Sequence, residues 1–164
     1  MQTGKLLSAK TDHAYLLKLM GDVRLTLCCT LDKLLENIFV DQSTTSIVID
    51  LSEADNLDST TLGLLAKIAI KASVMGLAQP SIISPNPDIT LLLESMGFRD
   101  YFVITPQPLT RQEELKEVPQ LAGSEAHVRA QVLDAHRTLM AMNESNRQAF
   151  KSVVQALEDC PHPC

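Results

Sequence analysis

A short apolar run followed closely by the start of a helix constrains the fold of this chain more than any other feature. Residues 46–51 have the length of a strand, and the continuous apolar run Ile47-Val48-Ile49 within them fits a strand buried on both faces of a sheet. Asp58 and Ser59 follow a few residues later and open an apolar helical pattern. Asp and Ser are favoured at helix starts because their side chains accept hydrogen bonds from unpaired backbone N–H groups. The sequence therefore predicts strand, polar connection and capped helix.

The start of this helix also suits a phosphate group. Unpaired N–H groups give a helix N-terminus a partial positive charge, which attracts anions. Ser59 is therefore interpreted as a serine that accepts a modification, and the alternative is that Ser59 or Asp58 only caps the helix.

Strands and helices alternate through residues 1–104. Strands are predicted at 5–10, 13–20, 46–51, 81–84 and 101–104, and helices after Thr26, over 59–75 and from Asn86 or Asp88 to Met96. The two-residue connection between the first two strands predicts an antiparallel hairpin. The later alternation predicts parallel strands. The predicted fold class is α/β, a mixed sheet with an opening antiparallel hairpin and later parallel strands, covered by helices.

The rest of the chain divides into three parts by composition. Residues 105–123 read as a proline-containing linker, 124–159 as a helical extension capped by Ser124, and 160–164 as a terminal tail. The extension is either one long rod or two helices broken within residues 143–146. It packs on its own domain, pairs with a second copy as a homodimer, or binds a partner, since its apolar residues permit a coiled-coil seam.

Charge and composition exclude several classes of protein. The net charge is −6 and no basic stripe is present, which argues against binding to nucleic acid. No apolar run reaches the roughly 20 residues of a membrane span, and Met1 to Lys10 lack the pattern of a signal peptide. We therefore expect a cytoplasmic protein, in which Cys28 and Cys29 are reduced packing residues.

No catalytic residue, metal site or cofactor site is predicted. Ser59 lacks the flanking glycines of a nucleophile elbow, and no base is identifiable, so a small hydrolase that uses Ser59 is the weaker alternative. His127 and His136 lie half a turn out of phase on one helix and are not expected to share a metal. Cys160, His162 and Cys164 offer only three ligands on a terminal tail, which favours a disordered end over a zinc site.

Residues 57–63 carry a family resemblance. Leu57, Asp58, Ser59, Thr60, Leu62 and Gly63 resemble the signature of STAS domains, the family of bacterial anti-sigma factor antagonists, and Thr61 stands where that family prefers glycine. The segments 21–23 and 87–98 also resemble parts of the family pattern. The resemblance covers roughly residues 5 to 104 and leaves the helical extension unexplained.

The resemblance implies a phosphorylation switch that controls sigma-factor-dependent transcription. An unmodified protein would bind an anti-sigma factor that is also a serine kinase, phosphorylation at Ser59 would release it, and a Ser/Thr phosphatase would reset the switch. The alternative is a STAS adaptor subunit that is not phosphorylated and serves a lipid-transport or signalling assembly. The partner-binding residues implied by the resemblance are Asp22, Asp55, Asn56, Leu57, Asp58, Ser59, Thr60, Thr61, Leu62 and Gly63.

Overall fold

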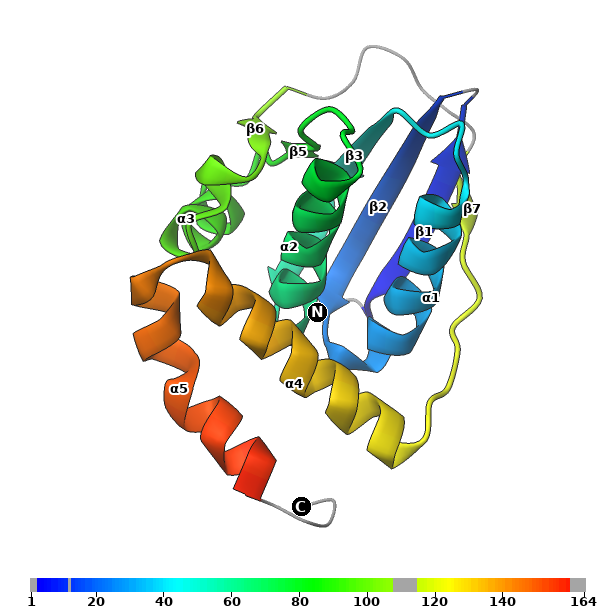
Figure 1. Cartoon of the computed structure of the whole chain (residues 1–164). Coiled ribbons are helices and arrows are strands. Elements are labelled where there is room, and N and C mark those ends of the chain that lie inside the picture. The colour runs from blue at the N-terminus through cyan, green and yellow to red at the C-terminus, as the bar shows by residue number, and fades with distance from the viewer. Residues whose placement is uncertain (1–2, 12, 108–114, 160–164) are drawn as a thin grey trace.

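A mixed sheet of seven strands forms one layer of the described residues and lies behind the helices in the view of Figure 1. The computed structural model describes residues 3–11, 13–107 and 115–159. The strands are β1 (Lys5–Lys10), β2 (Ala14–Val23), β3 (Ser46–Asp50), β4 (Ala54–Leu57), β5 (Ser81–Ile83), β6 (Val103–Thr105) and β7 (Lys116–Glu117). Their order is β6-β5-β3-β2-β1-β7, and β4 pairs with β2 off this path.

The sheet has the mixed topology that the sequence predicts. β1 and β2 form the antiparallel hairpin, whereas β3 is parallel to β2, β5 to β3, and β6 to β5. The α/β class and the division into an antiparallel start and a parallel remainder are confirmed.

Helices α1 and α2 cover one face of the sheet (Figure 1). The helices are α1 (Cys28–Val40), α2 (Ser59–Val74), α3 (Pro87–Ser95), α4 (Glu125–Met142) and α5 (Glu144–Asp159), with the short 3-10 helices η1 (Leu25–Leu27) and η2 (Phe98–Asp100). Ile47 and Ile49 of β3 are 2% and 0% exposed, but Val48 between them is only partly buried. The prediction that this strand is fully buried on both faces is therefore wrong for one face.

Two short strands lie where the sequence predicts irregular chain. β4 occupies the polar connection between β3 and α2, and β7 lies within the predicted linker 105–123. β7 pairs antiparallel with β1, so the N-terminal hairpin is not the edge of the sheet. Thr105 belongs to β6 rather than to a linker. Segments this short and polar carry no apolar period, because pairing with a neighbouring strand is what forms them.

The C-terminal extension folds back on the rest of the molecule as a pair of helices. Ser124 caps α4, and its side chain accepts a hydrogen bond of 3.1 Å from the backbone N–H of His127. The break between α4 and α5 falls at Asn143, within the polar stretch that the sequence offered for it. α4 packs on α2 and on α5. The predicted tail, 160–164, lies outside the described residues.

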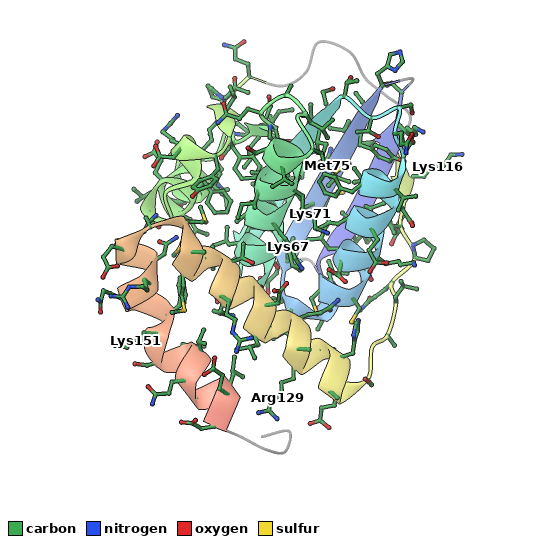
Figure 2. The ribbon with its side chains drawn as sticks, in the orientation of Figure 1. Lys67, Lys71, Met75, Lys116, Arg129 and Lys151 are labelled. Atoms are coloured by element: carbon green, nitrogen blue, oxygen red, sulfur yellow. The ribbon has the colours of Figure 1, made fainter. Side chains whose placement is uncertain are left out.

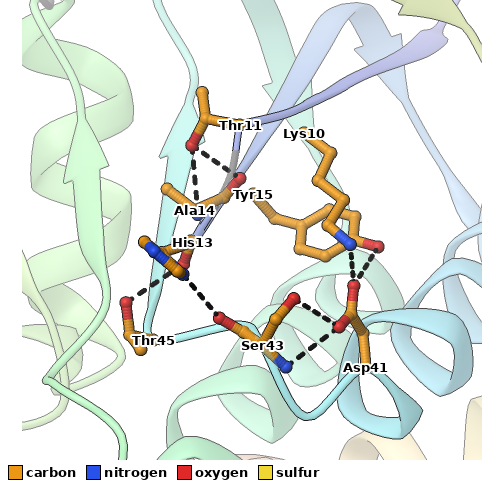
Figure 3. Close-up of polar contacts among 8 residues, drawn as sticks. All are labelled: Lys10, Thr11, His13, Ala14, Tyr15, Asp41, Ser43 and Thr45. Carbon is orange, nitrogen blue, oxygen red and sulfur yellow. Dashed lines mark hydrogen bonds and ion pairs between the residues drawn. The ribbon is translucent and has the colours of Figure 1, made fainter.

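Polar contacts fix the end of the sheet where β2 and β3 begin (Figure 3). Asp41, directly after α1, forms an ion pair with Lys10 and accepts hydrogen bonds from the backbone N–H and the hydroxyl of Ser43. These contacts, the Lys10 pair above all, hold the pKa of the Asp41 carboxyl well below its usual range. None of the predicted site residues lies at this end.

None of the helices within the described residues has both the length and the apolar character needed to cross a bilayer.

Candidate functional site

The junction between β4 and α2 is organised by Asp58. One of its carboxylate oxygens accepts a hydrogen bond of 2.8 Å from the backbone N–H of Thr61, which is the N-cap bond of α2. The other accepts a bond of 2.7 Å from the backbone N–H of Leu25 in η1. Asp58 therefore provides the cap that the sequence predicts at this helix start, and it also fixes the junction against the end of β2.

The Ser59 side chain is engaged by the C-terminal extension. Ser59 is the first residue of α2, and its Oγ lies 2.8 Å from Nε2 of His136 on α4. Nδ1 of His136 lies 2.7 Å from the backbone carbonyl oxygen of Val132. A carbonyl oxygen only accepts, so Nδ1 carries a proton, and in the neutral imidazole Nε2 accepts from the Ser59 hydroxyl.

His136 is held in place from several sides. It is 4% exposed, and its ring packs edge-on against the ring of Phe150 on α5, with the ring centroids 5.3 Å apart. Together with the bond to Val132, this packing fixes the orientation of the imidazole toward Ser59. No local sequence pattern predicts this contact, because the two residues lie 77 positions apart.

Three residues spaced by four form one stripe along α2, and α4 contacts all of them. Residues four apart lie on the same face of a helix. Ser59 meets His136, Gly63 lies against Ala135, and Lys67 forms an ion pair with Asp134. Figure 2 shows Lys67 at this crossing of α2 and α4. The Ser59, Gly63 and Lys67 stripe is called the α2 stripe below.

Gly63 permits the close approach of the two helices. A Cβ atom added to Gly63 would lie 2.7 Å from Cβ of Ala135, which is too close for any side chain there. Ala135 itself is 0% exposed. The glycine and the alanine thus let the two backbones approach at the crossing point.

The predicted partner-binding residues separate into an exposed group and a buried group. Asp22 and Asn56 are neighbours in the β2–β4 pairing, and Nδ2 of Asn56 donates to Asp22 at 3.5 Å. The exposed or partly exposed residues are Asp22, Asp55, Asn56, Asp58 and Ser59. The buried residues are Leu57, Thr60, Thr61, Leu62 and Gly63.

Thr61, at the position where the family prefers glycine, does not project from the junction. Its side chain is 2% exposed, and its backbone N–H donates the cap bond to Asp58. The β-branched side chain therefore packs inside the helix start rather than over the Ser59 hydroxyl.

A base that the sequence did not identify now lies beside Ser59. His136 has the distance and the oriented ring of a catalytic partner, yet it is buried inside a helix–helix contact. Two cavities, of about 680 and 500 Å³, lie elsewhere: one at the C-terminal end of α2 and one beside α3. Neither is lined by Ser59 or His136. The arrangement can hold a hydroxyl by a hydrogen bond, but these cavities place no substrate beside it.

Within residues 3–11, 13–107 and 115–159, no group of three or more His, Cys, Asp or Glu is placed to hold a metal ion. Cys160, His162 and Cys164 lie beyond the described residues.

Most of the chain matches a known protein family. The STAS domain model matches residues 7–114, which is more than half of the 164 residues. The comparison with curated proteins gave no match.

The solved structures that share the fold include two of SpoIIAA. One is the Bacillus cell fate determinant SpoIIAA in the phosphorylated form, with 13% identity and a TM-score of 0.51; the match covers 63% of this chain and 91% of that one. The other is the anti-sigma factor antagonist SpoIIAA in its unphosphorylated form, with 15% identity and a TM-score of 0.52, covering 65% and 90%. At such identities the likeness establishes the fold.

Proposed function

Because the chain belongs to the STAS domain family, we propose that it is an anti-sigma factor antagonist whose binding is switched at Ser59. Unmodified, it binds an anti-sigma factor that is also a serine kinase and so frees a sigma factor for transcription. Phosphorylated at Ser59, it releases that partner. A Ser/Thr phosphatase resets the switch, and the protein works in the cytoplasm as a binding regulator rather than as an enzyme.

The position of Ser59 carries this proposal. It is the first residue of α2, directly after the Asp58 cap, in a fold shared with a protein solved in phosphorylated and unphosphorylated forms. The exposed Asp55 and Asn56 lie in β4 just before it, and Asp22 lies beside them. These residues form the surface where a partner would first meet the switch.

A single phosphate is enough to act as a switch here. It adds about −1.5 to −2 charges and three acceptor oxygens. The N-terminus of α2 stabilises this charge, so the fold tolerates it. A partner surface that fits a neutral hydroxyl does not. A penalty of about 3 kcal/mol in the complex would weaken binding by more than about a hundredfold.

Mass spectrometry of protein purified from its native host with phosphatase inhibitors tests the proposal. We expect a species about 80 Da heavier than the unmodified chain, with the added mass on the peptide that contains Ser59. A pull-down should then recover the kinase with Ser59→Ala and not with Ser59→Asp. Phosphate on Thr60 or Thr61 would move the acceptor but keep the mechanism. No phosphate under several growth states would contradict it.

One observation favours a second candidate, a STAS adaptor that binds its partner constitutively. The Ser59 hydroxyl is already engaged by His136, as expected if the residue is a structural contact rather than an acceptor. The adaptor predicts that Ser59→Ala and Ser59→Asp recover the same partners in equal amounts.

A further inference from the structure

We infer that the α4–α5 helical pair is a cover over the switch face, so that the structure is a closed form and phosphorylation of Ser59 requires α4 to leave α2. That Ser59 acts as a switch rests on the proposed function. The cover itself rests on contacts between α4 and α2, and neither the STAS match nor the SpoIIAA structures account for it, since the match ends at residue 114.

The contacts of α4 fall on Ser59 and Gly63, two of the predicted partner-binding residues, and on Lys67 one turn further along α2. His136 forms a hydrogen bond with the Ser59 hydroxyl. Ala135 packs directly against Gly63, and Asp134 forms an ion pair with Lys67. Three successive residues of α4 thus occupy the whole α2 stripe. A partner that binds this stripe must replace α4, and the chemistry that fits is a second helix with a small residue opposite Gly63 and a polar group opposite Ser59.

α5 strengthens the cover, so the two helices act as one unit. Arg137 of α4 forms an ion pair of 2.6 Å with Glu158, and Arg129 donates to the carbonyl oxygen of Leu157. Phe150 backs the His136 ring. Removing His136 from Ser59 without moving α5 would break these contacts.

The transfer step cannot take place in the closed form. The Ser59 Oγ must attack the terminal phosphorus of a nucleoside triphosphate, forming the Oγ–P bond as the bond to the departing diphosphate breaks. The hydroxyl proton passes to a base of the kinase. With Nε2 of His136 at 2.8 Å, the attacking oxygen is hydrogen-bonded to a buried imidazole instead of being aligned with a phosphate.

A buried side chain of α4 makes the closed form less stable than it would otherwise be. Gln131 lies one turn before Ala135 on α4, is 7% exposed, and neither polar atom of its side chain has a hydrogen-bond partner among the described residues. A buried amide without partners disfavours the state that buries it. Opening α4 returns this amide to water, which lowers the free-energy difference between closed and open forms.

The fraction of molecules in the open form would determine how strongly the protein binds its partner. If only the open form binds the partner or the kinase, the apparent affinity falls in proportion to the open fraction. Any partner that binds the α4–α5 pair, or any change that weakens its contact with α2, would then raise both partner binding and phosphorylation. Residues 124–159 would set the sensitivity of the switch.

A cysteine probe in the full chain tests the cover without a kinase. In Ser59→Cys protein, iodoacetamide labelling is followed by peptide mass spectrometry, which separates residue 59 from the other cysteines. We expect labelling at 59 about tenfold or more below that of the urea-unfolded chain. Adding Ala135→Gln, which forces a larger polar side chain against Gly63, should raise it about tenfold. Adding Gln131→Leu should lower it.

The matched control is Ala130→Gln, the same change on an exposed position of α4. It should leave labelling at residue 59 within about twofold of the parent. Cys28, which is 2% exposed in the core, reports unfolding of the whole domain in every sample. If Ala135→Gln labels Cys28 as well, that variant is unfolded, and the decision then rests on the Gln131→Leu result and on the parent protein.

Two results would overturn the cover: labelling of residue 59 in the parent at the rate of the unfolded chain, or no response to either α4 variant. Both are independent of the proposed function. A protected residue 59 without phosphate in cells would leave the cover standing and remove the switch. Phosphate on Ser59 in cells, together with free labelling of residue 59, would support the switch and contradict the cover.

Discussion

The Ser59–His136 hydrogen bond joins two segments that are remote in the sequence. The hydroxyl lies at the positive end of α2, and the imidazole is oriented by a backbone carbonyl and by the Phe150 ring. The His136 end of this pair is buried, so breaking the bond there is costly, because the imidazole loses its hydrogen bond without regaining water.

Truncating the imidazole should therefore destabilise the protein. We expect His136→Ala to lower the free energy of unfolding by about 2 kcal/mol, from the lost hydrogen bond and the space left beside Phe150. Urea denaturation followed by circular dichroism measures it. His127→Ala, at an exposed position of the same helix, is the control and should change stability by less than about 0.5 kcal/mol. Equal effects of the two changes would show that the imidazole contact is not stabilising.

Cys28 provides a pH-dependent prediction. Burial raises the pKa of its thiol from an ordinary value of 9.0 to about 12, with adjacent Cys29 adding to the shift. The folded state therefore favours the neutral thiol more than the unfolded state does. Its contribution to stability is complete below about pH 9 and is lost as the pH rises from there toward about 12.

Urea denaturation at a series of pH values above 8 checks this. The free energy of unfolding should fall with pH, and the fall should be shallower in Cys28→Ala, which has no thiol to ionise at this position. A variant with the same pH slope as the parent would rule out a contribution from Cys28.

At the scale of elements, the corner between α4 and α5 determines where the extension docks. The Asn143 side chain accepts a hydrogen bond of 2.7 Å from the backbone N–H of Asn146 and so caps α5. Nδ2 of Asn146 donates to the carbonyl oxygen of Met96, at the end of α3, at 2.8 Å. Asn146 is 2% exposed. Two asparagines thus break the helix and attach the break to the domain.

Removing the Asn146 side chain should loosen this attachment. We expect Asn146→Ala to cost about 1 to 3 kcal/mol, because the Met96 carbonyl oxygen loses a buried donor. Hydrogen–deuterium exchange should show faster exchange in α4 and α5 than in the parent, with the sheet less affected. Ser145→Ala, at the exposed neighbouring position, should leave exchange unchanged. Identical exchange in all three proteins would show that the corner does not anchor the extension.

At the scale of the whole molecule, the extension uses its apolar residues within its own chain. Ala135 and Leu139 of α4 are fully buried, and Val154 of α5 is 7% exposed. The seam that the sequence offered for self-association is therefore occupied along α4. What remains on α5 is limited to exposed positions such as Val153, which is 41% exposed.

We accordingly expect a monomer. Light scattering coupled to size exclusion should give a mass near 18.0 kDa at micromolar concentration. A mass twice this value would mean that a second copy covers the outer face of α5 or replaces α4 in the partner. Repeating the measurement with Val153→Glu distinguishes these cases, since only a dimer through α5 would dissociate.

The sequence by itself determined the elements that local pattern and chain order control. The apolar run at 47–49, the Asp58 cap and the glycines after α2 and α3 each act within a few residues. Alternating strands and helices then leave few ways to build a sheet. The motif around Ser59 could be read for the same reason, because its signal lies in consecutive residues.

The tertiary structure alone decided what covers that motif. His136 lies 77 residues from Ser59, and a histidine on an amphipathic helix carries no mark of the side chain it will meet. From the sequence, Gly63 is only a residue within a helix. It marks the crossing of α2 and α4 because Ala135 packs against it in the folded protein. β7 forms because its backbone pairs with the edge of β1. Contacts between remote segments depend on how whole elements pack, and no local pattern encodes that packing.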